Sequence, residues 1–531
     1  MSGDGIGGAH VVACKHVRGE GAAFHAFDPA NGATLEPAFA DADAGIVAKA
    51  CEAARSAEDS FASVDGHGRA AFLRAIAREL ESLGDRLLLR AARETGLPNA
   101  RLVTERGRTM FQLETFARVV EEGSWIDARI DRADPTRKPA PKPDLRAMLV
   151  PLGPVAVFGA SNFPLAYSVA GGDTASAFAA GCPVVVKAHP MHPGTSELAA
   201  EAIVRAARAS GMPQGVFSMV HGRSHEVGRA LVENPAIAAV GFTGSKQGGA
   251  ALFRVAASRD CPIPVFAEMG SVNPVFVLPA ALAARGGAVG SALAGSALLA
   301  CGQFCTSPGM VAFVEGPGAD SLVSAVEAAI AASTPGTFVH ADIRSGFDRA
   351  ITEVEQRGEV KLLAAAKMDA IDVATTGRAR AYVVDAGAVL RSHRLREEIY
   401  GPAFLLVRCR DAAEMLAVAE SMQGHLTATV HAEASDLPAH EALLRSIRKR
   451  VGRIVHNGVP TGVEVCAAMQ HGGPWPASSD SRFTAVGARA ILRWARTVAF
   501  QDAPAPTLPA ALRDGNPLGI WRTVDGALGK A

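Results

Sequence analysis

A cysteine and a glutamate lie in two short segments of this chain whose residues suit covalent catalysis. Cys305 lies in residues 302–309 (GQFCTSPG), and Glu268 lies in residues 266–274 (FAEMGSVNP). Each segment combines one reactive side chain with the Gly and Pro residues that an unusual backbone path requires. A thiolate can attack an electrophilic carbon while a separate carboxylate acts as a base. The pair therefore predicts an enzyme in which Cys305 is the nucleophile and forms a covalent bond to the substrate.

The region before these segments predicts the elements that position them. Between residues 153 and 270, short β-branched runs alternate with Ala-rich stretches, which is typical of a parallel sheet with crossover helices. We expect strands at residues 154–158, 184–187, 216–220, 239–242 and 264–267, and helices at residues 164–180, 196–209, 226–233 and 250–258. Such an open, doubly wound sheet binds ligands at the carboxyl ends of its strands.

Polar residues follow these predicted strand ends. They are Asn162, Lys187, Thr243, Gly244, Ser245 and Glu268. The dinucleotide fingerprint Gly-x-Gly-x-x-Gly is missing after the first strand, so a nucleotide would have to be held in another way. Residues 241–249 (GFTGSKQGG) offer a Gly-rich turn that enters a helix, where backbone amides can meet a pyrophosphate. The sequence therefore predicts a binding site at this edge of the sheet.

The flanking segments predict further elements. Residues 40–118 have the pattern of Ala-rich amphipathic helices, and a second α/β pattern runs from Cys305 to about residue 500. Residues 135–154 are Pro-rich and basic, which indicates a linker or an arm. The last thirty residues, rich in Pro, Ala and Gly, predict a surface tail.

Composition narrows the class of protein. The 531 residues are 49% hydrophobic, which predicts a large core and two or more domains. The 53 basic and 53 acidic residues cancel and are interspersed, so nothing favours nucleic acid or an anionic membrane as a partner. No secretory signal is evident, and residues 286–302 are shorter and less apolar than a bilayer span. We therefore expect a cytoplasmic protein with a small-molecule partner.

The eight cysteines do not form a recognisable framework. They are scattered along the chain, with no paired Cys-x-x-Cys motifs. We expect reduced thiols and no metal site.

Six motifs, in this order, resemble the aldehyde dehydrogenase superfamily. They are residues 158–165 (FGASNFPL), 185–187 (VVK), 241–245 (GFTGS), 268–274 (EMGSVNP), 302–305 (GQFC) and 397–402 (EEIYGP). The likeness spans roughly residues 25–500. A narrower resemblance, to the branch with 2-oxoglutarate semialdehyde (2,5-dioxopentanoate) dehydrogenases and NADP-dependent fatty aldehyde dehydrogenases, rests on residues 105–109 (ERGRT), 161–176 (SNFPLAYSVAGGDTAS) and 471–477 (HGGPWPA).

The resemblance implies an α/β fold with three parts. A Rossmann-type parallel sheet forms a cofactor-binding domain from residues 1–135 and 151–271, and a second α/β catalytic domain, residues 272–480, carries the thiol. Residues 136–150 and 481–531 form a small β oligomerisation arm and a C-terminal tail. A homodimer or homotetramer is expected, because relatives pair through such an arm.

The resemblance also implies the reaction, which is NAD(P)-dependent oxidation of an aldehyde to a carboxylic acid. The Cys305 thiolate adds to the aldehyde, the oxyanion of the thiohemiacetal expels hydride to the nicotinamide, and a thioester remains. Asn162 and the backbone N–H of Cys305 donate to the oxyanion. Glu268 then activates the water that hydrolyses the thioester, which argues for a free acid as product.

For the cofactor, the resemblance assigns Lys187 to the adenosine ribose, Thr243, Gly244 and Ser245 to the pyrophosphate, and Glu398 to the nicotinamide ribose, with Tyr400 nearby. Pro190 stands where NAD-preferring relatives carry an acidic residue. The missing carboxylate favours NADP, with NAD also accepted. Arg223 or His225 is then a candidate partner for the 2′-phosphate.

For the substrate, the resemblance places Tyr167 and Phe304 at the tunnel, with Arg106 or Arg108 on a bordering helix. An arginine there can hold the distal carboxylate of a short oxo-acid aldehyde in bidentate fashion, which favours 2-oxoglutarate semialdehyde. A medium or long-chain aliphatic aldehyde is the alternative substrate. An alternative function, from another class of protein, is that of a non-catalytic nucleotide-binding protein on the same scaffold. Considered without its motif, Cys305 also fits the role of a small buried apolar residue. Arg106 and Arg108, considered in the same way, also fit an exposed helical face.

Overall fold

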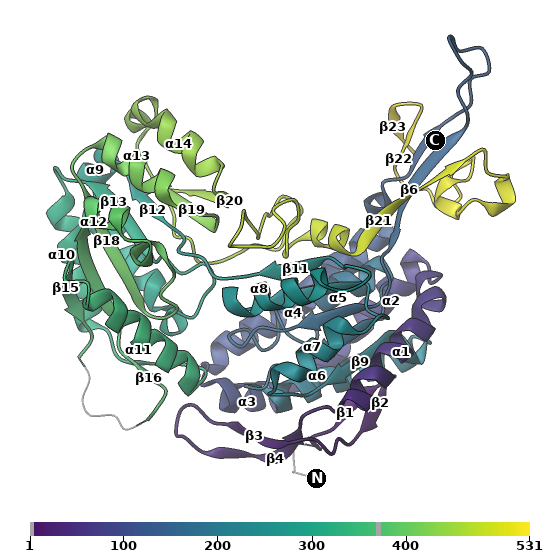
Figure 1. Cartoon of the computed structure of the whole chain (residues 1–531), viewed down its shortest axis with the longest axis horizontal. Coiled ribbons are helices and arrows are strands. Elements are labelled where there is room, and N and C mark those ends of the chain that lie inside the picture. Colours follow the sequence, from purple (N-terminus) through teal and green to yellow (C-terminus); the bar gives the residue numbers. More distant parts are fainter. Residues whose placement is uncertain (1–4, 368–372, 531) are drawn as a thin grey trace.

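The computed structural model describes residues 5–367 and 373–530 and contains two α/β bodies with a sheet that projects from the first (Figure 1). The first body is built on a seven-stranded sheet with the order β11-β10-β7-β8-β9-β1-β2. Its strands are β1 (His10–Val12), β2 (Lys15–Val17), β7 (Val155–Phe158), β8 (Val184–Lys187), β9 (Phe217–Val220), β10 (Ala239–Thr243) and β11 (Val265–Glu268). Strands β7 to β11 are parallel, which confirms the five predicted strands and the doubly wound sheet.

Helices cover this sheet on both faces (Figure 1). They are α1 (Ala44–Ala62), α2 (Gly66–Ser82), α3 (Gly84–Thr95), α4 (Asn99–Glu122), α5 (Gly172–Ala180), α6 (Pro193–Ala209), α7 (His225–Glu233) and α8 (Lys246–Ala257). A hairpin of β3 (Ala23–Phe27) and β4 (Thr34–Ala40) precedes α1. Helix α1 begins at an N-cap, where the Asp43 side chain accepts from the backbone N–H of Ile46.

The predicted helix at residues 164–180 is wrong in its first half, because α5 begins only at Gly172. The preceding residues form a loop. Its amides at Leu165 and Ala166 donate to the buried Glu105 carboxylate of α4, at 2.8 and 3.0 Å. Two hydrogen bonds to a distant carboxylate thus replace the first helical turn.

The second body is built on another seven-stranded sheet, with the order β15-β17-β18-β13-β12-β19-β20. Its strands are β12 (Val275–Val277), β13 (Met310–Val314), β15 (Val360–Ala365), β17 (Arg380–Asp385), β18 (Ala403–Cys409), β19 (His425–His431) and β20 (Val451–His456). All of its pairs are parallel except β15 with β17. Its helices are α9 (Pro279–Leu298), α10 (Ala319–Ala332), α11 (Ala341–Glu355), α12 (Ala386–Arg391), α13 (Ala412–Ser421) and α14 (Glu441–Arg448); β14 (Gly336–Thr337) pairs with β16 (Thr376–Gly377).

Helix α9 is longer than the apolar stretch noted in the sequence. With the turn that follows it, residues 279–302 are long and apolar enough to cross a membrane by length and composition alone. The buried residues Leu282, Val289 and Leu293 belong to one hydrophobic cluster with residues of α10 and of the second sheet. This packing is that of a core helix.

A third sheet, with the order β21-β6-β5-β22-β23, projects from the first body, away from the second (Figure 1). Its strands are β5 (Arg129–Asp131), β6 (Leu145–Pro151), β21 (Ala495–Gln501), β22 (Arg522–Val524) and β23 (Ala527–Gly529). The C-terminal residues are therefore not a surface tail. Leu512 and Ile520 are buried in a small core with Ala128 and Ile130.

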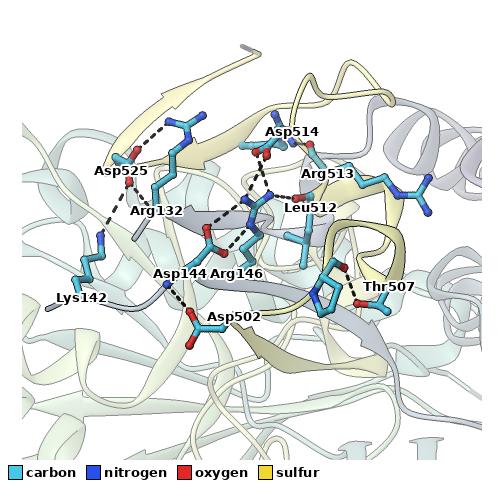
Figure 2. A network of polar contacts seen from close by, with 12 residues as sticks. Arg132, Lys142, Asp144, Arg146, Asp502, Thr507, Leu512, Arg513, Asp514 and Asp525 are labelled. Atoms are coloured by element: carbon cyan, nitrogen blue, oxygen red, sulfur yellow. Dashed lines mark hydrogen bonds and ion pairs between the residues drawn. The ribbon is translucent and has the colours of Figure 1, made fainter. Parts of the chain in front are cut away.

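Ion pairs fix the C-terminal residues to this projecting sheet, as Figure 2 shows. Arg146 on β6 pairs with Asp144 at 2.8 Å and with Asp514 at 3.0 Å. Arg132 pairs with Asp525 at 2.9 Å. The Arg132–Asp525 pair is exposed and contributes at most about 1 kcal/mol, whereas Arg146 is itself buried. The buried apolar residues carry most of the docking free energy.

Candidate active site

The predicted polar residues lie at one edge of the first sheet, where the chain crosses to the second body. Lys187 ends β8 and pairs in register with Phe158 of β7, and Glu268 ends β11 and pairs with Thr243 of β10. Directly after Glu268 the chain crosses to β12 of the second sheet. The site therefore lies between the two α/β bodies.

Asn273, within this crossing, holds the segment that carries the thiol. Its side-chain amide donates to the backbone carbonyls of Cys305 and Ser307, both at 2.8 Å. Asn273 is fully buried and has a φ of 50°, in the left-handed region that asparagine tolerates better than most residues. The crossing thus brings the predicted nucleophile to the edge of the first sheet.

Three consecutive left-handed residues lead into the thiol segment. Ala300, Cys301 and Gly302 have φ values of 47°, 56° and 67°. A Cβ on Gly302 would lie 2.2 Å from the backbone of Gly401, so only glycine fits there. The thiol segment is therefore packed directly against the segment that contains Glu398 and Tyr400.

Asn162 lies beside the thiol segment, as predicted for an oxyanion donor. Its side-chain amide donates to the backbone carbonyl of Gln303 at 2.8 Å, and the residue is 8% exposed. An NH₂ group has two hydrogens, and the second also interacts with the Tyr400 hydroxyl, which lowers the pKa of that hydroxyl.

Cys305 lies in an environment that disfavours its ionisation. Burial raises the pKa of the thiol to about 12, and the charges of Glu268 and Glu398 raise it further, whereas Arg453 opposes this shift. The sulfur also lies 3.6 Å from Nε2 of His471. Burial lowers the pKa of His471 to about 3, so this imidazole is neutral at pH 7.

Glu268 is a buried carboxyl group that is free to act on water. It is 9% exposed, and its Oε2 is buried with no hydrogen-bond partner in the described parts of the chain. Burial raises its pKa well above the usual value, Arg493 opposes the shift, and Asp173 adds to it. A carboxyl group with a raised pKa is a stronger base when ionised, as a deacylating base needs to be.

The residues assigned to the cofactor fit a dinucleotide. Burial lowers the pKa of Lys187 to about 8, and burial raises that of Glu398 to about 7. The Glu398 carboxylate accepts from the Ser271 amide at 3.3 Å and can take further donors such as ribose hydroxyls. Ser245 is the N-cap of α8, where its hydroxyl accepts from Gly248 N at 3.1 Å, so backbone amides are available to a pyrophosphate.

Gly244 and Tyr400, two other residues that the resemblance assigns to the cofactor, lie close to Glu268 and Glu398. The amide of Gly244 donates to the Glu268 carbonyl at 3.0 Å, which joins the ends of β10 and β11. Burial raises the pKa of Tyr400 well above its usual value, and the charges of Glu398 and Cys305 contribute, so its hydroxyl lies near both.

Arg223 and His225 are exposed where β9 leads into α7. Here the structure adds Asp41, which the sequence reading missed. Its carboxylate accepts from the backbone amides of Arg223 at 2.6 Å and Ser224 at 3.2 Å, and its charge acts on Lys187. A carboxylate therefore lies near the lysine even though Pro190 is not acidic.

Aromatic rings surround the approach to the thiol. Phe163 makes edge contacts with Phe304 and Tyr167, with ring centroids 5.3 and 5.2 Å apart. The Arg101 guanidinium lies over Phe163 and Phe304 at 4.7 and 5.2 Å. Phe163 lies within the motif at residues 158–165, but Arg101 carries no local signal that would have identified it from the sequence.

Tyr167 connects the reactive groups with Arg108. Arg108 donates to the Tyr167 hydroxyl at 3.2 Å. Burial raises the pKa of Tyr167 to about 12; Arg108 opposes this, and the charges of Cys305 and Glu268 add to it. Tyr167 therefore lies within electrostatic reach of the thiol, the carboxylate and the guanidinium.

Arg106 does not reach this group, and its assignment to the substrate is wrong. It donates to the Gly84 carbonyl at 3.3 Å, at the start of α3. Residues two apart on a helix point about 200° from each other, so Arg106 and Arg108 cannot share one face.

Comparisons with known proteins agree with this geometry. Residues 16–484 match the model of the aldehyde dehydrogenase family. The chain is 48% identical to alpha-ketoglutaric semialdehyde dehydrogenase 2 of Azospirillum brasilense, over 98% of this chain and 99% of that protein. It is 44% identical to alpha-ketoglutaric semialdehyde dehydrogenase of Acinetobacter baylyi, over 92% and 93% of the two chains.

Solved structures of other aldehyde dehydrogenases share the fold. A mutant of aldehyde dehydrogenase C from Pseudomonas syringae, in complex with NAD⁺ and octanal, matches with a TM-score of 0.78 and 20% identity, over 94% of this chain and 97% of that one. Members of the family use NAD or NADP. By sequence and by fold, this chain belongs to the aldehyde dehydrogenase family.

Proposed function

We propose that this enzyme oxidises 2-oxoglutarate semialdehyde (2,5-dioxopentanoate) to 2-oxoglutarate, with NADP as the preferred cofactor. Two relatives at 48% and 44% identity are named for this substrate, under the synonym alpha-ketoglutaric semialdehyde. The observation that carries the proposal is the position of Tyr167, which lies among Cys305, Glu268 and Arg108. An aldehyde at the thiol could thus extend an anionic end toward a guanidinium.

In the proposed reaction, the Cys305 sulfur forms a bond to the aldehyde carbon, and the carbonyl oxygen becomes an oxyanion. The Asn162 side-chain amide, which interacts with the Tyr400 hydroxyl before substrate binds, and the Cys305 backbone N–H donate to that oxyanion. A nicotinamide cofactor, when held by Lys187, Ser245 and Glu398, would supply the hydride acceptor for the former aldehyde carbon. A thioester on Cys305 remains, which stores the acyl group until water arrives.

Glu268 serves the second half of the reaction. Its carboxylate takes a proton from water as the water oxygen attacks the thioester carbon. The C–S bond then breaks, and the product leaves with two carboxylates. The sum is one aldehyde, one water and one oxidised cofactor converted to one carboxylate, one reduced cofactor and two protons.

The NADP preference rests on fewer groups. Pro190 leaves the ribose site without an acidic residue at that position, and the side chain of Arg223 is exposed nearby. Asp41 disfavours NADP, because a carboxylate repels a 2′-phosphate. Two backbone N–H donors to Asp41 reduce this repulsion.

An initial-rate panel tests substrate and cofactor together. The proposal expects kcat/KM to be highest with 2-oxoglutarate semialdehyde and NADP, and Arg223→Ala to raise the KM for NADP more than that for NAD. A higher kcat/KM for pentanal or decanal than for the oxo acid would contradict the substrate. His225→Ala is a matched variant, since His225 is the other exposed candidate for the phosphate.

We further propose that the chain is divided into three functional parts. Residues 1–135 and 151–271 would bind the cofactor, residues 272–480 would carry the thiol, and residues 136–150 and 481–531 would join subunits of a cytoplasmic homodimer or homotetramer. The projecting sheet of Figure 1 supports this, because its outer strands β21 and β23 each have one unpaired edge among the strands of that sheet. Light scattering after gel filtration measures the assembly.

A further inference from the structure

Two arginines from different bodies hold one loop beside the thiol. Arg108 of α4 donates to the backbone carbonyl of Val463. Arg453 of β20 donates to the carbonyl of Gly462 at 2.7 Å and to that of Pro460. The loop at residues 460–463 is also fixed to α9, because the hydroxyls of Thr461 and Ser296 lie 2.6 Å apart. Both guanidinium groups therefore have fixed positions around this loop.

Neither of these guanidinium groups forms an ion pair in the described parts of the chain, although the charge of the buried Glu105 carboxyl acts on Arg108. Within the parts of the chain that the structure describes, their hydrogen bonds go to three backbone carbonyls and the Tyr167 hydroxyl, all neutral. The Nε of Arg108 is buried and has no acceptor in the same parts of the chain. The other arginines around the site do have counter-ions: Arg101 pairs with Glu105 at 3.7 Å, and Arg493 pairs with Asp173 at 2.7 Å.

A chain of contacts connects this pair to the reacting sulfur. Tyr167, which accepts from Arg108, has its ring centroid 6.4 Å from that of His471. His471 Nε2 is 3.6 Å from the Cys305 sulfur. Arg453 is the arginine whose charge acts on both Cys305 and Tyr167. The two unpaired cations thus lie beyond the thiol, on the side of Tyr167.

A partly buried cation without a counter-ion is costly, and a ligand that brings an anion removes this cost. We propose that Arg108 and Arg453 together bind the 2-oxo acid end of the substrate, which makes Arg453 a specificity-determining residue. The carboxylate and the neighbouring ketone oxygen present adjacent acceptors, which suit guanidinium donors better than a single ammonium. This inference rests on the proposed function and identifies its selectivity: aldehydes that end in a 2-oxo acid are preferred over uncharged aldehydes of equal length.

The test compares selectivity, defined as kcat/KM for 2-oxoglutarate semialdehyde divided by kcat/KM for pentanal. Arg453→Met and Arg108→Met are each expected to lower this ratio by about 100-fold, since each removes one partner of a charge-assisted contact. Arg106→Met is the matched control, because Arg106 lies on the same helix and bonds Gly84 instead; its ratio should stay at the parental value. Equal losses for both substrates, or an unchanged ratio in Arg453→Met, would overturn the inference.

A binding measurement separates this inference from the reaction itself. 2-Oxoglutarate is expected to inhibit pentanal oxidation competitively, with an inhibition constant raised about 100-fold in Arg453→Met and partly restored in Arg453→Lys. Equal inhibition of parent and variant would overturn the two-arginine site. If the parent enzyme instead preferred pentanal to the oxo acid, the proposed function would fail first, whatever the variants did.

Discussion

Arg101 donates to the backbone carbonyl of Asn162 at 2.7 Å, across 61 residues of sequence. The same arginine pairs with Glu105, whose carboxylate holds the amides of Leu165 and Ala166. The loop that carries the predicted oxyanion donor is therefore fixed by helix α4 at Asn162 itself and at Leu165 and Ala166, shortly after it. This contact gives α4 a part in positioning the amide.

Arg101→Met is expected to lower kcat by roughly tenfold to 100-fold, with a smaller change in KM, because a displaced amide weakens binding of the transition state more than of the substrate. Initial rates over a range of substrate concentrations separate the two constants. Arg118→Met is the control on the same helix, where Arg118 is exposed and pairs with Glu114. A rise in KM alone would assign Arg101 to substrate binding instead.

Asn162→Ala removes the proposed oxyanion donor itself. We expect kcat to fall by about 100- to 1000-fold, the usual effect of losing one such donor. This fall in kcat should be at least as large as that caused by Arg101→Met. In the variant that carries both changes, kcat should fall by less than the product of the two separate factors. Steady-state rates at saturating substrate measure it, and a fall of less than threefold would leave Asn162 as a structural residue.

The environment of Cys305 predicts a particular pH dependence. The pKa of the thiol is raised to about 12, so the thiol is protonated at pH 7, and the thiolate fraction grows with pH up to that value. The rate of Cys305 alkylation by iodoacetamide in the free enzyme should rise about tenfold per pH unit between pH 7 and 10. Mass spectrometry of the peptide that contains Cys305 follows this rate apart from the other cysteines. A plateau before pH 9 would mean that the thiol ionises far more easily.

Gly302→Ala tests the packing of the thiol segment against Gly401. A methyl group there would lie 2.2 Å from the Gly401 backbone, at a φ of 67°. We expect turnover to fall at least about 100-fold, because the segment must move by an ångström or more. Gly295→Ala is the matched control in α9, where an added Cβ meets nothing within 4 Å. That change should leave turnover unaltered and raise the free energy of unfolding by about 0.5 to 1 kcal/mol.

Much of this architecture could be predicted from local pattern. The five parallel strands were correct because buried strands between Ala-rich helices have a regular period, as at Val184–Lys187 and Val265–Glu268. The Gly and Pro residues around Cys305 and Glu268 predicted unusual backbone paths, which the structure has at Gly302 and Asn273, whereas the catalytic roles of Cys305 and Glu268 stay predictions.

What the sequence could not reveal depends on contacts between distant residues. Glu105 replaces the first turns of the predicted helix at residues 164–180, and no local signal distinguishes it from a surface glutamate. Arg101 and Arg453 belong to α4 and β20 and reach the site only after the two bodies meet. The C-terminal residues looked polar and irregular because their small core, around Leu512, forms with Ile130 almost four hundred residues earlier.

The central claim is that the reaction passes through a thioester on Cys305, and that Glu268 activates the water that hydrolyses this thioester. The most direct measurement mixes Glu268→Gln with NADP and 2-oxoglutarate semialdehyde, quenches the mixture in acid after one turnover, and determines the mass of the peptide with Cys305. The account predicts a rapid burst of reduced cofactor, equal to the number of active sites, and a matching mass increase on Cys305 from the 2-oxoglutaryl group. Reduced cofactor formed at a steady rate with an unmodified Cys305 peptide would contradict it.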